Sequence, residues 1–241
     1  MKIGILKTDK VRPEWVGEFG EYPDMFERLL LAEDPSLEFQ TWDVESGELP
    51  TDLDAADGFI ITGSKSSAYD DKGWIRALEN FIQRIHASRR KLIGICFGHQ
   101  VIAKALGAIV DKSPKGWGCG IQTYQLKDAE LAADGIGEDL RLIASHQDQV
   151  ITVPAGAVVI AASDHCNIAG FRIDDHILTF QGHPEFIPAY SREIMHFRRE
   201  MIGESRVATG LASLDSEQHQ GARVARWMLD FLSSDEDQRR L

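Results

Sequence analysis

The chain has 241 residues, of which 43% are hydrophobic and 27% are charged, and its formal net charge at pH 7 is -12. This composition is that of a soluble globular protein and excludes a mainly disordered, collagenous or membrane-spanning chain. The negative charge argues against nucleic acid or an anionic membrane as a partner, because an acidic protein releases no counterions from a polyanion.

The length predicts one domain spanning residues 1–241. No export signal is visible at the amino terminus, because the apolar run 3–6 is short and charges follow it at once. The cysteines, Cys96, Cys119 and Cys166, are widely spaced and odd in number, which indicates neither a disulfide framework nor a zinc site. We therefore expect reduced thiols, a cytoplasmic location and no bound metal.

The first half of the chain alternates short apolar runs with segments of helical period. Strands are predicted at 2–6, 37–43, 58–62 and 91–95, and helices at 26–34, 75–87 and 99–107. Runs that are apolar throughout, such as 59–61 and 92–95, are typical of parallel strands buried on both faces, and right-handed helical crossovers connect such strands. A buried helical turn is the alternative, but the lengths and the flanking glycines favour strands. This alternation of predicted strands and helices indicates an α/β fold with a central, mostly parallel sheet flanked by helices.

Beyond Gly107 the character of the chain changes. Short strands are predicted at 121–126, 140–145, 158–163 and 177–181. Turn signals between them, such as Asp174-Asp175, predict hairpins or antiparallel strands added to the sheet. Two helices, near 188–202 and 216–233, are predicted to close the chain. The last residues of the chain, about eight of them, are predicted to fray.

The stretch 92–107 joins an apolar strand to a helix through Cys96, Phe97 and Gly98. Such a strand-turn-helix exposes one side chain at the carboxyl edge of the sheet, where the N–H groups and the dipole of the helix favour an anion. A thiol there ionises more readily, and the thiolate is the attacking species. Gly98 is consistent with a sharp elbow that strains one residue. The alternative is that Cys96 is a small buried core residue.

A cysteine nucleophile needs a histidine within hydrogen-bond reach and a third group that orients the ring. In the run 177–186, His183 and Glu185 follow a predicted strand, and residues i and i+2 of an extended chain point to the same side. We predict that Glu185 orients His183, which acts as the base. An exposed turn with a solvated histidine is the alternative. His99, in the first turn of the predicted helix, is expected to pack or bond locally.

The segment Thr62-Gly63-Ser64 follows another predicted central strand. Backbone N–H groups at such a position can stabilise an oxyanion, and those of Ser64 and Phe97 are the candidate pair. A bound oxyanion donor of this kind lowers the barrier by roughly 3 kcal/mol. A plain turn between a strand and a loop is the alternative.

The segment Ser145-His146-Gln147 ends the predicted strand at 140–145. Its polar groups either face the same pocket or belong to a surface loop, and the sequence is compatible with both. The stretch 117–120 is typical of a tight strand start with glycines on both sides of Cys119, and we interpret Cys119 and Cys166 as structural.

Four segments together resemble the class I glutamine amidotransferase family, and within it the glutaminase part of GMP synthase. They are GICFGHQ (94–100) for the nucleophile, QGHPEF (181–186) for the histidine and glutamate, ITGSKSS (61–67) for the oxyanion loop and SHQDQV (145–150) for the substrate side. Their order along the chain is that of the family. The resemblance implies a flavodoxin-like fold with Cys96, His183 and Glu185 as a catalytic triad.

The resemblance also implies the chemistry. Cys96 would attack the γ-amide of glutamine, or of a related γ-glutamyl compound, and form a γ-glutamyl thioester with release of ammonia or an amine. Water would then hydrolyse the thioester. Gln100 would help to hold this small-molecule substrate, and the backbone around Ser145, His146 and Gln147 would contact its amino-acid end. No cofactor is expected.

Two features depart from the family. The chain has Gly63-Ser64-Lys65 where the family has Gly-Gly-Pro, and no nucleotide-dependent synthetase segment follows in its 241 residues. The protein is therefore expected to act either as the glutaminase partner of a separate synthetase subunit or alone. One alternative is a γ-glutamyl peptidase that acts on glutathione-type conjugates. The alternatives from other classes are a non-catalytic regulatory or binding subunit and a cysteine redox sensor, and the complete Cys-His-Glu set argues against both.

Overall fold

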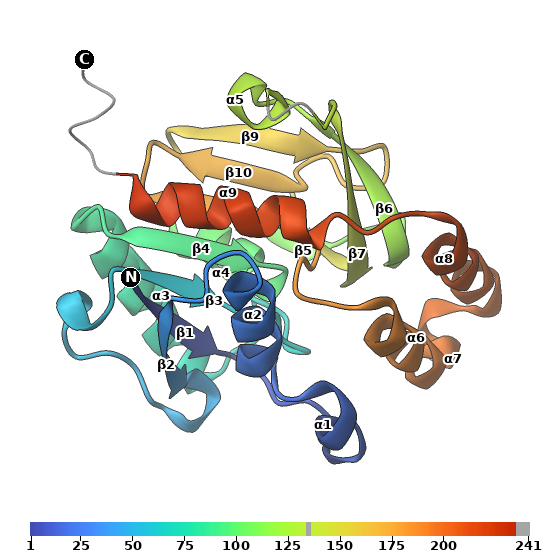
Figure 1. The fold of residues 1–241 in the computed structure, drawn as a ribbon, viewed down its shortest axis with the longest axis horizontal. Helices are drawn as coiled ribbons and strands as arrows, with labels where there is room; N and C mark the ends of the chain where they lie inside the picture. Colours follow the sequence, from blue (N-terminus) through green and yellow to red (C-terminus); the bar gives the residue numbers. More distant parts are fainter. Residues whose placement is uncertain (134–135, 235–241) are drawn as a thin grey trace.

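The computed structural model describes residues 1–133 and 136–234 of the chain. Its strands are β1 (Lys2–Lys7), β2 (Glu38–Asp43), β3 (Gly58–Ile61), β4 (Lys91–Ile95), β5 (Val110–Lys112), β6 (Gly118–Leu126), β7 (Asp139–His146), β8 (Asp148–Val150), β9 (Ala157–Ala162), β10 (Gly170–Ile173) and β11 (Ile177–Phe180). Nine of them form a central sheet in the order β2-β1-β3-β4-β11-β10-β9-β6-β7, and β5 pairs with β8 at its side (Figure 1).

The helices are α1 (Pro13–Phe19), α2 (Tyr22–Leu31), α3 (Gly73–Ala87), α4 (Phe97–Ala105), α5 (Ala129–Ala132), α6 (Pro188–Phe197), α7 (Arg199–Ile202), α8 (Glu204–Ser216) and α9 (Gly221–Ser233). Short 3-10 turns lie at Val44–Ser46 and Leu53–Ala55. Within the described part of the chain, no helix is long and apolar enough to cross a lipid bilayer.

One half of the sheet is parallel and the other half is antiparallel. The neighbouring strands β2, β1, β3, β4 and β11 run parallel to one another. The strands β10, β9, β6 and β7 continue the sheet in antiparallel pairs. The predicted α/β fold, with a parallel sheet and added antiparallel strands, is therefore confirmed.

The parallel half has a hydrophobic core on each face, because alternate residues of its strands point to opposite sides. On one face Ile60 and Ile93 pack with α2 and α9. On the other face Phe59 and Leu92 pack with α3 and α4, as Figure 1 shows for the two helix layers. This double coverage explains why these strands are apolar throughout.

The sequence predicts two closing helices, but the structure has four between Pro188 and Ser233. The predicted number of closing helices is therefore wrong. The segment 188–202 is divided at Arg198 into α6 and α7, residues 204–216 form α8, and the last helix begins at Gly221 and not at 216. The apolar sequence pattern of α8 is weak because the helix contacts β6 through glycine. A Cβ on Gly120, in β6, would lie 2.5 Å from the Cα of Gly210, in α8. A helix that packs through glycine shows little apolar period.

The sequence pattern also missed α1, β10 and the β5-β8 pair, all of which are short. The turn signal Asp174-Asp175 lies between β10 and β11, which pair as an antiparallel hairpin. The predicted fraying of the chain end concerns residues beyond Ser234, which lie outside the described residues.

Candidate active site

Cys96 connects β4 to α4 with an unusual backbone, φ 54° and ψ -101°. Residues with a side chain rarely adopt this combination, which costs on the order of 1–3 kcal/mol. The surrounding hydrogen bonds hold it in place. Its N–H donates to the Phe180 carbonyl at 2.9 Å, and its carbonyl accepts from the Gln100 N–H at 3.1 Å. The strained residue of the elbow is therefore the candidate nucleophile itself.

Gly98 serves close packing of this elbow and has no positive φ. A Cβ added to it would lie 2.4 Å from the Ile61 carbonyl oxygen. A Cβ on Gly94, in β4, would in turn lie 2.6 Å from the carbonyl carbon of Gly98. The start of α4 therefore rests directly on the backbones of β3 and β4, and this contact sets the position of Cys96.

His183 is held on three sides. Its ring Nδ1 lies 2.8 Å from Glu185 Oε1, and its backbone N–H donates to the Ile143 carbonyl at 2.8 Å. Its ring also stacks on the Phe186 ring, with centroids 3.8 Å apart and an angle of 8° between the planes. His183 and Glu185 are 3% and 4% exposed. Because Nδ1 faces the carboxylate, Nε2 is the nitrogen left to exchange a proton with another group.

The side chains of Cys96 and His183 both lie next to the Cα of Gly63. A Cβ on Gly63 would lie 2.8 Å from Cε1 of His183 and 3.7 Å from Cβ of Cys96, so only a glycine leaves both side chains in place. Burial lowers the pKa of His183, but the negative charges of Glu185 and of Cys96 outweigh it and raise that pKa to about 10. The arrangement thus favours a protonated His183 ring at neutral pH.

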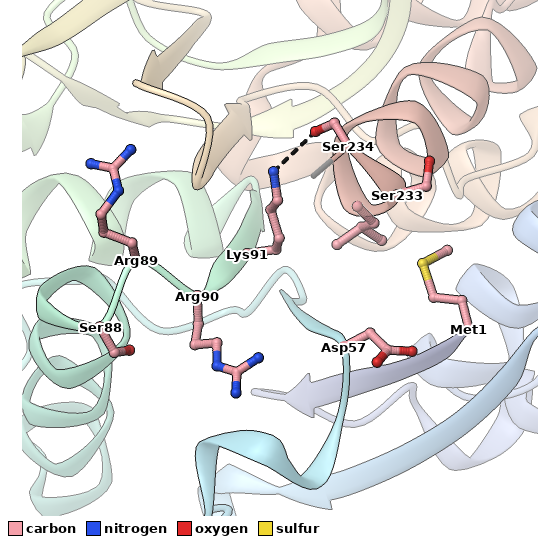
Figure 2. Close-up of a pocket in the computed structure, with 9 residues that line it drawn as sticks. Met1, Asp57, Ser88, Arg89, Arg90, Lys91, Ser233 and Ser234 are labelled. Carbon is pink, nitrogen blue, oxygen red and sulfur yellow. Dashed lines mark hydrogen bonds between the residues drawn. The ribbon is translucent and has the colours of Figure 1, made fainter. Parts of the chain in front are cut away.

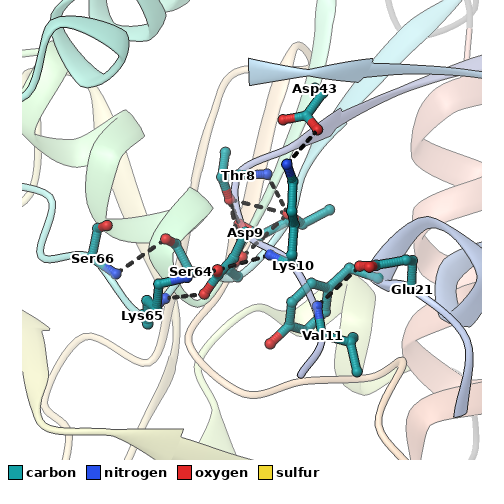
Figure 3. Close-up of polar contacts among 12 residues, drawn as sticks. Thr8, Asp9, Lys10, Val11, Glu21, Asp43, Ser64, Lys65 and Ser66 are labelled. Carbon is teal, nitrogen blue, oxygen red and sulfur yellow. Dashed lines mark hydrogen bonds and ion pairs between the residues drawn. The ribbon is translucent and has the colours of Figure 1, made fainter. Parts of the chain in front are cut away.

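The loop that contains Gly63, Ser64 and Lys65 is tied to the residues after β1 (Figure 3). Thr8 Oγ1 donates to the Gly63 carbonyl at 3.0 Å. Asp9 accepts the Lys65 N–H at 2.7 Å and contacts its Nζ at 2.6 Å. These bonds fix the loop beside the Cys96 and His183 side chains. The assignment of the Ser64 and Phe97 amides to an oxyanion hole stays a prediction.

Gln100 is buried and links two segments that follow different strands. Its Nε2 donates to the Asp148 carbonyl at 2.8 Å and to Gln181 Oε1 at 3.1 Å. Both hydrogens of the amide are used in this way, which leaves only Oε1 for a ligand. Substrate binding by Gln100 stays a prediction, and the structure narrows it to an acceptor role.

The segment Ser145-His146-Gln147 is not an exposed loop. Ser145 Oγ accepts from Arg198 Nη1 at 3.1 Å, His146 Nδ1 lies 3.1 Å from the Asp148 carbonyl, and the Gln147 carbonyl accepts from the Ser113 N–H at 3.0 Å. Burial lowers the pKa of His146 to about 3, so its ring is neutral at pH 7. Its Nε2 has no hydrogen-bond partner among the described residues. The predicted contact of this segment with a substrate stays open.

The other histidine near the elbow, His99, is occupied elsewhere. Its ring nitrogens lie 2.9 Å from Thr179 Oγ1 and 3.1 Å from the Ile168 carbonyl, and burial lowers its pKa to about 3. The prediction that His99 packs is confirmed, although its partners are distant in sequence. Cys119 and Cys166 are also buried, and burial raises the pKa of both thiols, that of Cys166 to about 12.

The sequence reasoning missed three supporting residues, Thr8, Asp9 and Phe186. Thr8 and Asp9 directly follow β1, whose carboxyl end lies beside that of β3. A polar pair at the end of a predicted parallel strand is the signal that could have shown them. Phe186 belongs to the motif quoted for the histidine, but its stacking on the ring appears only in three dimensions. Among the described residues, no group of three or more His, Cys, Asp or Glu side chains is arranged to hold a metal ion.

Two sizeable cavities lie at opposite edges of the parallel strands. One, of about 780 Å³, is lined by Arg89, Arg90 and Lys91 at the amino edge of β4 (Figure 2). The other, of about 700 Å³, is lined by Asp9, Lys65 and other residues beside the Gly63 loop. Neither Cys96 nor His183 lines the second cavity, but its lining includes Tyr190, which packs on the Phe186 ring that stacks on His183.

Comparison with known proteins places this geometry in context. The family model "Glutamine amidotransferase class-I" matches residues 24–200. γ-Glutamyl peptidase 3 of Arabidopsis thaliana is 37% identical over 169 residues, which are 66% of this chain and 66% of that protein. A Saccharomyces cerevisiae protein provisionally named a glutamine amidotransferase is 37% identical over 201 residues, 77% of this chain and 78% of that protein.

A similar structure has also been solved. The crystal structure of a glutamine amidotransferase from Thermotoga maritima superposes with a TM-score of 0.75. The superposition covers 96% of this chain and 99% of that chain at 18% identity. At this identity the likeness concerns the fold alone.

Proposed function

Because the chain belongs to the class I glutamine amidotransferase family, we propose that it is a cysteine-dependent amidohydrolase of glutamine or a related γ-glutamyl compound. The observation that supports this most strongly is the convergence of Cys96, on a strained elbow, with the buried His183-Glu185 pair over Gly63. A structural cysteine would not require strain or a charged histidine beside it.

In the first step of the proposed mechanism, the Cys96 thiolate attacks the γ-carbonyl carbon of the substrate. The carbonyl oxygen becomes an oxyanion, for which the Ser64 and Phe97 amides are our candidate donors. The C–N bond then breaks, and the His183 imidazolium gives its proton to the leaving nitrogen. Ammonia or an amine departs and a γ-glutamyl thioester remains.

In the second step, neutral His183 takes a proton from water, and the resulting hydroxide adds to the thioester carbonyl. The C–S bond breaks, glutamate leaves, and the thiolate-imidazolium pair is restored. Glu185 keeps Nδ1 protonated in both steps, so Nε2 faces the reaction. Cys96, His183 and water are sufficient to balance the protons of both steps.

Two leaving groups are compatible with this chemistry. Ammonia would make the protein a glutaminase, and a separate synthetase subunit would then consume the ammonia. An amino acid or peptide would make it a γ-glutamyl peptidase, for example on glutathione-type conjugates. The second candidate is favoured by the Arabidopsis thaliana relative and by a cavity of about 700 Å³ beside the site, far larger than ammonia requires. The three free cysteines are compatible with the expected cytoplasmic location.

The test is the release of ammonia or amine from purified protein given glutamine, γ-glutamyl dipeptides and a glutathione conjugate in parallel. We expect turnover of at least one of them by the wild type and none by Cys96→Ala. Higher kcat/KM on γ-glutamyl peptides would identify a peptidase, and preference for glutamine would identify a glutaminase. Equal release by wild type and Cys96→Ala would exclude the mechanism.

A further inference from the structure

The cavity of about 700 Å³ is lined by Lys65, which follows the Gly63-Ser64 backbone, and by Tyr190. The leaving nitrogen takes its proton from His183, so it must lie on the imidazole side of the thioester carbon. Tyr190 lines the cavity and packs edge-on against Phe186 at 4.8 Å between centroids, and Phe186 stacks on His183. Lys65, which also lines the cavity, follows the Gly63-Ser64 backbone, and Gly63 lies beside the His183 ring. On the Tyr190 side, Tyr190 and Phe186 lie between the cavity and the imidazole.

One wall of this cavity is aromatic. Trp15 meets Tyr190 and Phe197 edge-on, with centroids 6.1 Å and 5.9 Å apart. Phe197 is 57% exposed, although Trp15 meets it edge-on and the guanidinium carbon of Arg12 lies 3.9 Å from the centre of its ring. Open aromatic faces of this kind favour apolar and aromatic groups of a ligand.

The charge of the lining is opposite to that of the protein. Four cationic side chains and two acidic ones line the cavity of a chain whose net charge is -12. The cations are Lys10, Arg12, Lys65 and Arg198. An excess of positive charge in a concave site attracts anionic ligands.

Three of these cations already have a carboxylate partner. Lys10 contacts Asp43 at 3.5 Å, Arg12 contacts Glu14 at 2.5 Å, and Lys65 contacts Asp9 at 2.6 Å. Arg198 differs: Nη1 donates to Ser145 Oγ, and the guanidinium carbon lies 5.5 Å from the centre of the Trp117 ring. Among residues 1–133 and 136–234, it has no carboxylate within ion-pair distance.

The side chain of Arg198 is also preorganised. It lies at the junction of α6 and α7, with φ -93° and ψ 11°, where the helical segment is interrupted. The bond to Ser145 and the contact with Trp117 restrict its side chain, and a preorganised guanidinium loses little freedom when it binds. A carboxylate is the planar anion that a guanidinium matches best.

We propose that this cavity is the leaving-group subsite and that Arg198 binds the free carboxylate of the leaving group, an amino acid or short peptide with an apolar or aromatic side chain. The inference rests on the proposed function and specifies its substrate class. Glutamine, whose leaving group is ammonia, would not reach Arg198.

The test compares γ-glutamyl-phenylalanine with γ-glutamyl-phenylalanine amide, which differ only in the carboxylate of the leaving group, and with glutamine. In the wild type we expect kcat/KM about 10- to 100-fold higher for the acid than for its amide, the range of a charge-assisted hydrogen bond. Arg198→Met should remove this preference, mainly through KM, and leave glutamine turnover within about twofold. Arg198→Lys should restore part of the preference.

Arg192→Met is the matched control, because Arg192 lies on the same helix, pairs with Asp215 and does not line the cavity. It should keep the preference for the acid. An equal loss on glutamine in Arg198→Met would overturn the proposal, since Arg198 would then act on the γ-glutamyl part of the substrate. An unchanged preference in Arg198→Met would overturn it as well.

Direct binding separates the failure of this inference from that of the proposed function. Cys96→Ala protein is titrated with both phenylalanine compounds by calorimetry, with and without Arg198→Met in the same chain. Tighter binding of the acid that disappears with Arg198→Met supports the subsite even if the wild type turns over neither compound, a result that would count against the proposed reaction alone. Equal binding of acid and amide overturns the subsite.

Discussion

The residues that flank β4 have the same backbone angle φ, but this angle has a different structural role at each end of the strand. Arg89 precedes the strand and Cys96 follows it, and both have φ 54°. Arg89 ends α3 in the conformation that commonly stops a helix: the Arg90 N–H donates to the Ile85 carbonyl at 3.1 Å, as in a Schellman motif. Its side chain pairs with Asp174 and Asp175 at the surface.

Cys96 starts a helix instead of ending one. Its ψ of -101° lies outside the left-handed region, its side chain is buried, and the surrounding backbone bonds hold the strain. A positive φ at the amino edge of the sheet is therefore an ordinary helix end, whereas at the carboxyl edge it positions a nucleophile. What distinguishes the two is the environment: paired surface charges around Arg89 and a buried histidine beside Cys96.

Cys96→Ala should lower turnover by about 10⁴-fold or more, because no other group of the site can form the thioester. The melting temperature should stay within a few degrees of the wild type, since alanine carries nearly the same backbone strain. Kinetics and thermal unfolding check the two parts. Cys119→Ala is the control and should keep most of the activity, and a comparable loss there would move the nucleophile away from the elbow.

Glu185→Gln should lower kcat/KM by about 10²- to 10⁴-fold, because the amide no longer orients and charges His183. Loss of the carboxylate also lowers the pKa of His183. Since the proposed acid is the protonated ring, the alkaline limb of the pH–rate profile should move to lower pH. Glu193→Gln, an exposed change on α6, is the control. An alkaline limb that stays in place in Glu185→Gln would contradict the role of His183.

The same pair predicts how stability depends on pH. The pKa of His183 is raised from 6.5 to about 10 in the folded protein. The stabilisation is therefore fully present below pH 6.5 and is lost as the pH rises towards 10. Urea unfolding of wild type and Glu185→Gln across this range should give free energies of unfolding that converge at high pH. A constant difference would exclude a charged His183.

Gly98→Ala should lower the free energy of unfolding by about 1–3 kcal/mol and reduce activity, because its Cβ would press on the Ile61 carbonyl and shift the elbow. Gly73→Ala is the matched control, since a Cβ there meets nothing within 4 Å. Urea unfolding and kcat/KM of the two variants provide the check. Equal effects of the two substitutions would mean that the contact of α4 with β3 does not set the elbow.

Arg89→Gly should have the smallest effect. Glycine relieves the cost of a positive φ, about 1 kcal/mol, but the exposed pairs with Asp174 and Asp175 are lost, which costs about the same. The free energy of unfolding should change by less than about 1 kcal/mol, and kcat/KM should not change. A clear loss of activity would show that the amino edge of β4 is coupled to the site and would weaken the contrast between the two ends.

The parallel half of the fold could be predicted in detail because its strands are buried on both faces and its helices have a strong apolar period. The antiparallel half was less predictable. The helix at 204–216 packs on β6 through glycine, and β10 has only four residues, so neither shows a clear pattern. Such elements are determined by the surface that they meet, and that surface comes from distant parts of the chain.

The family, the fold class and the candidate catalytic residues Cys96, His183 and Glu185 could be predicted from the amino-acid sequence alone. This was possible because a nucleophile, its base and the orienting group lie in short contiguous motifs. Three features emerged only from the packed fold: Cys96 itself is strained, Gly63 leaves space for the histidine, and Arg198 lies beside an open cavity with no carboxylate partner among the described residues. The physical reason is that strain, close approach and pairing depend on atoms that are far apart in the chain and are brought together only by the packed sheet.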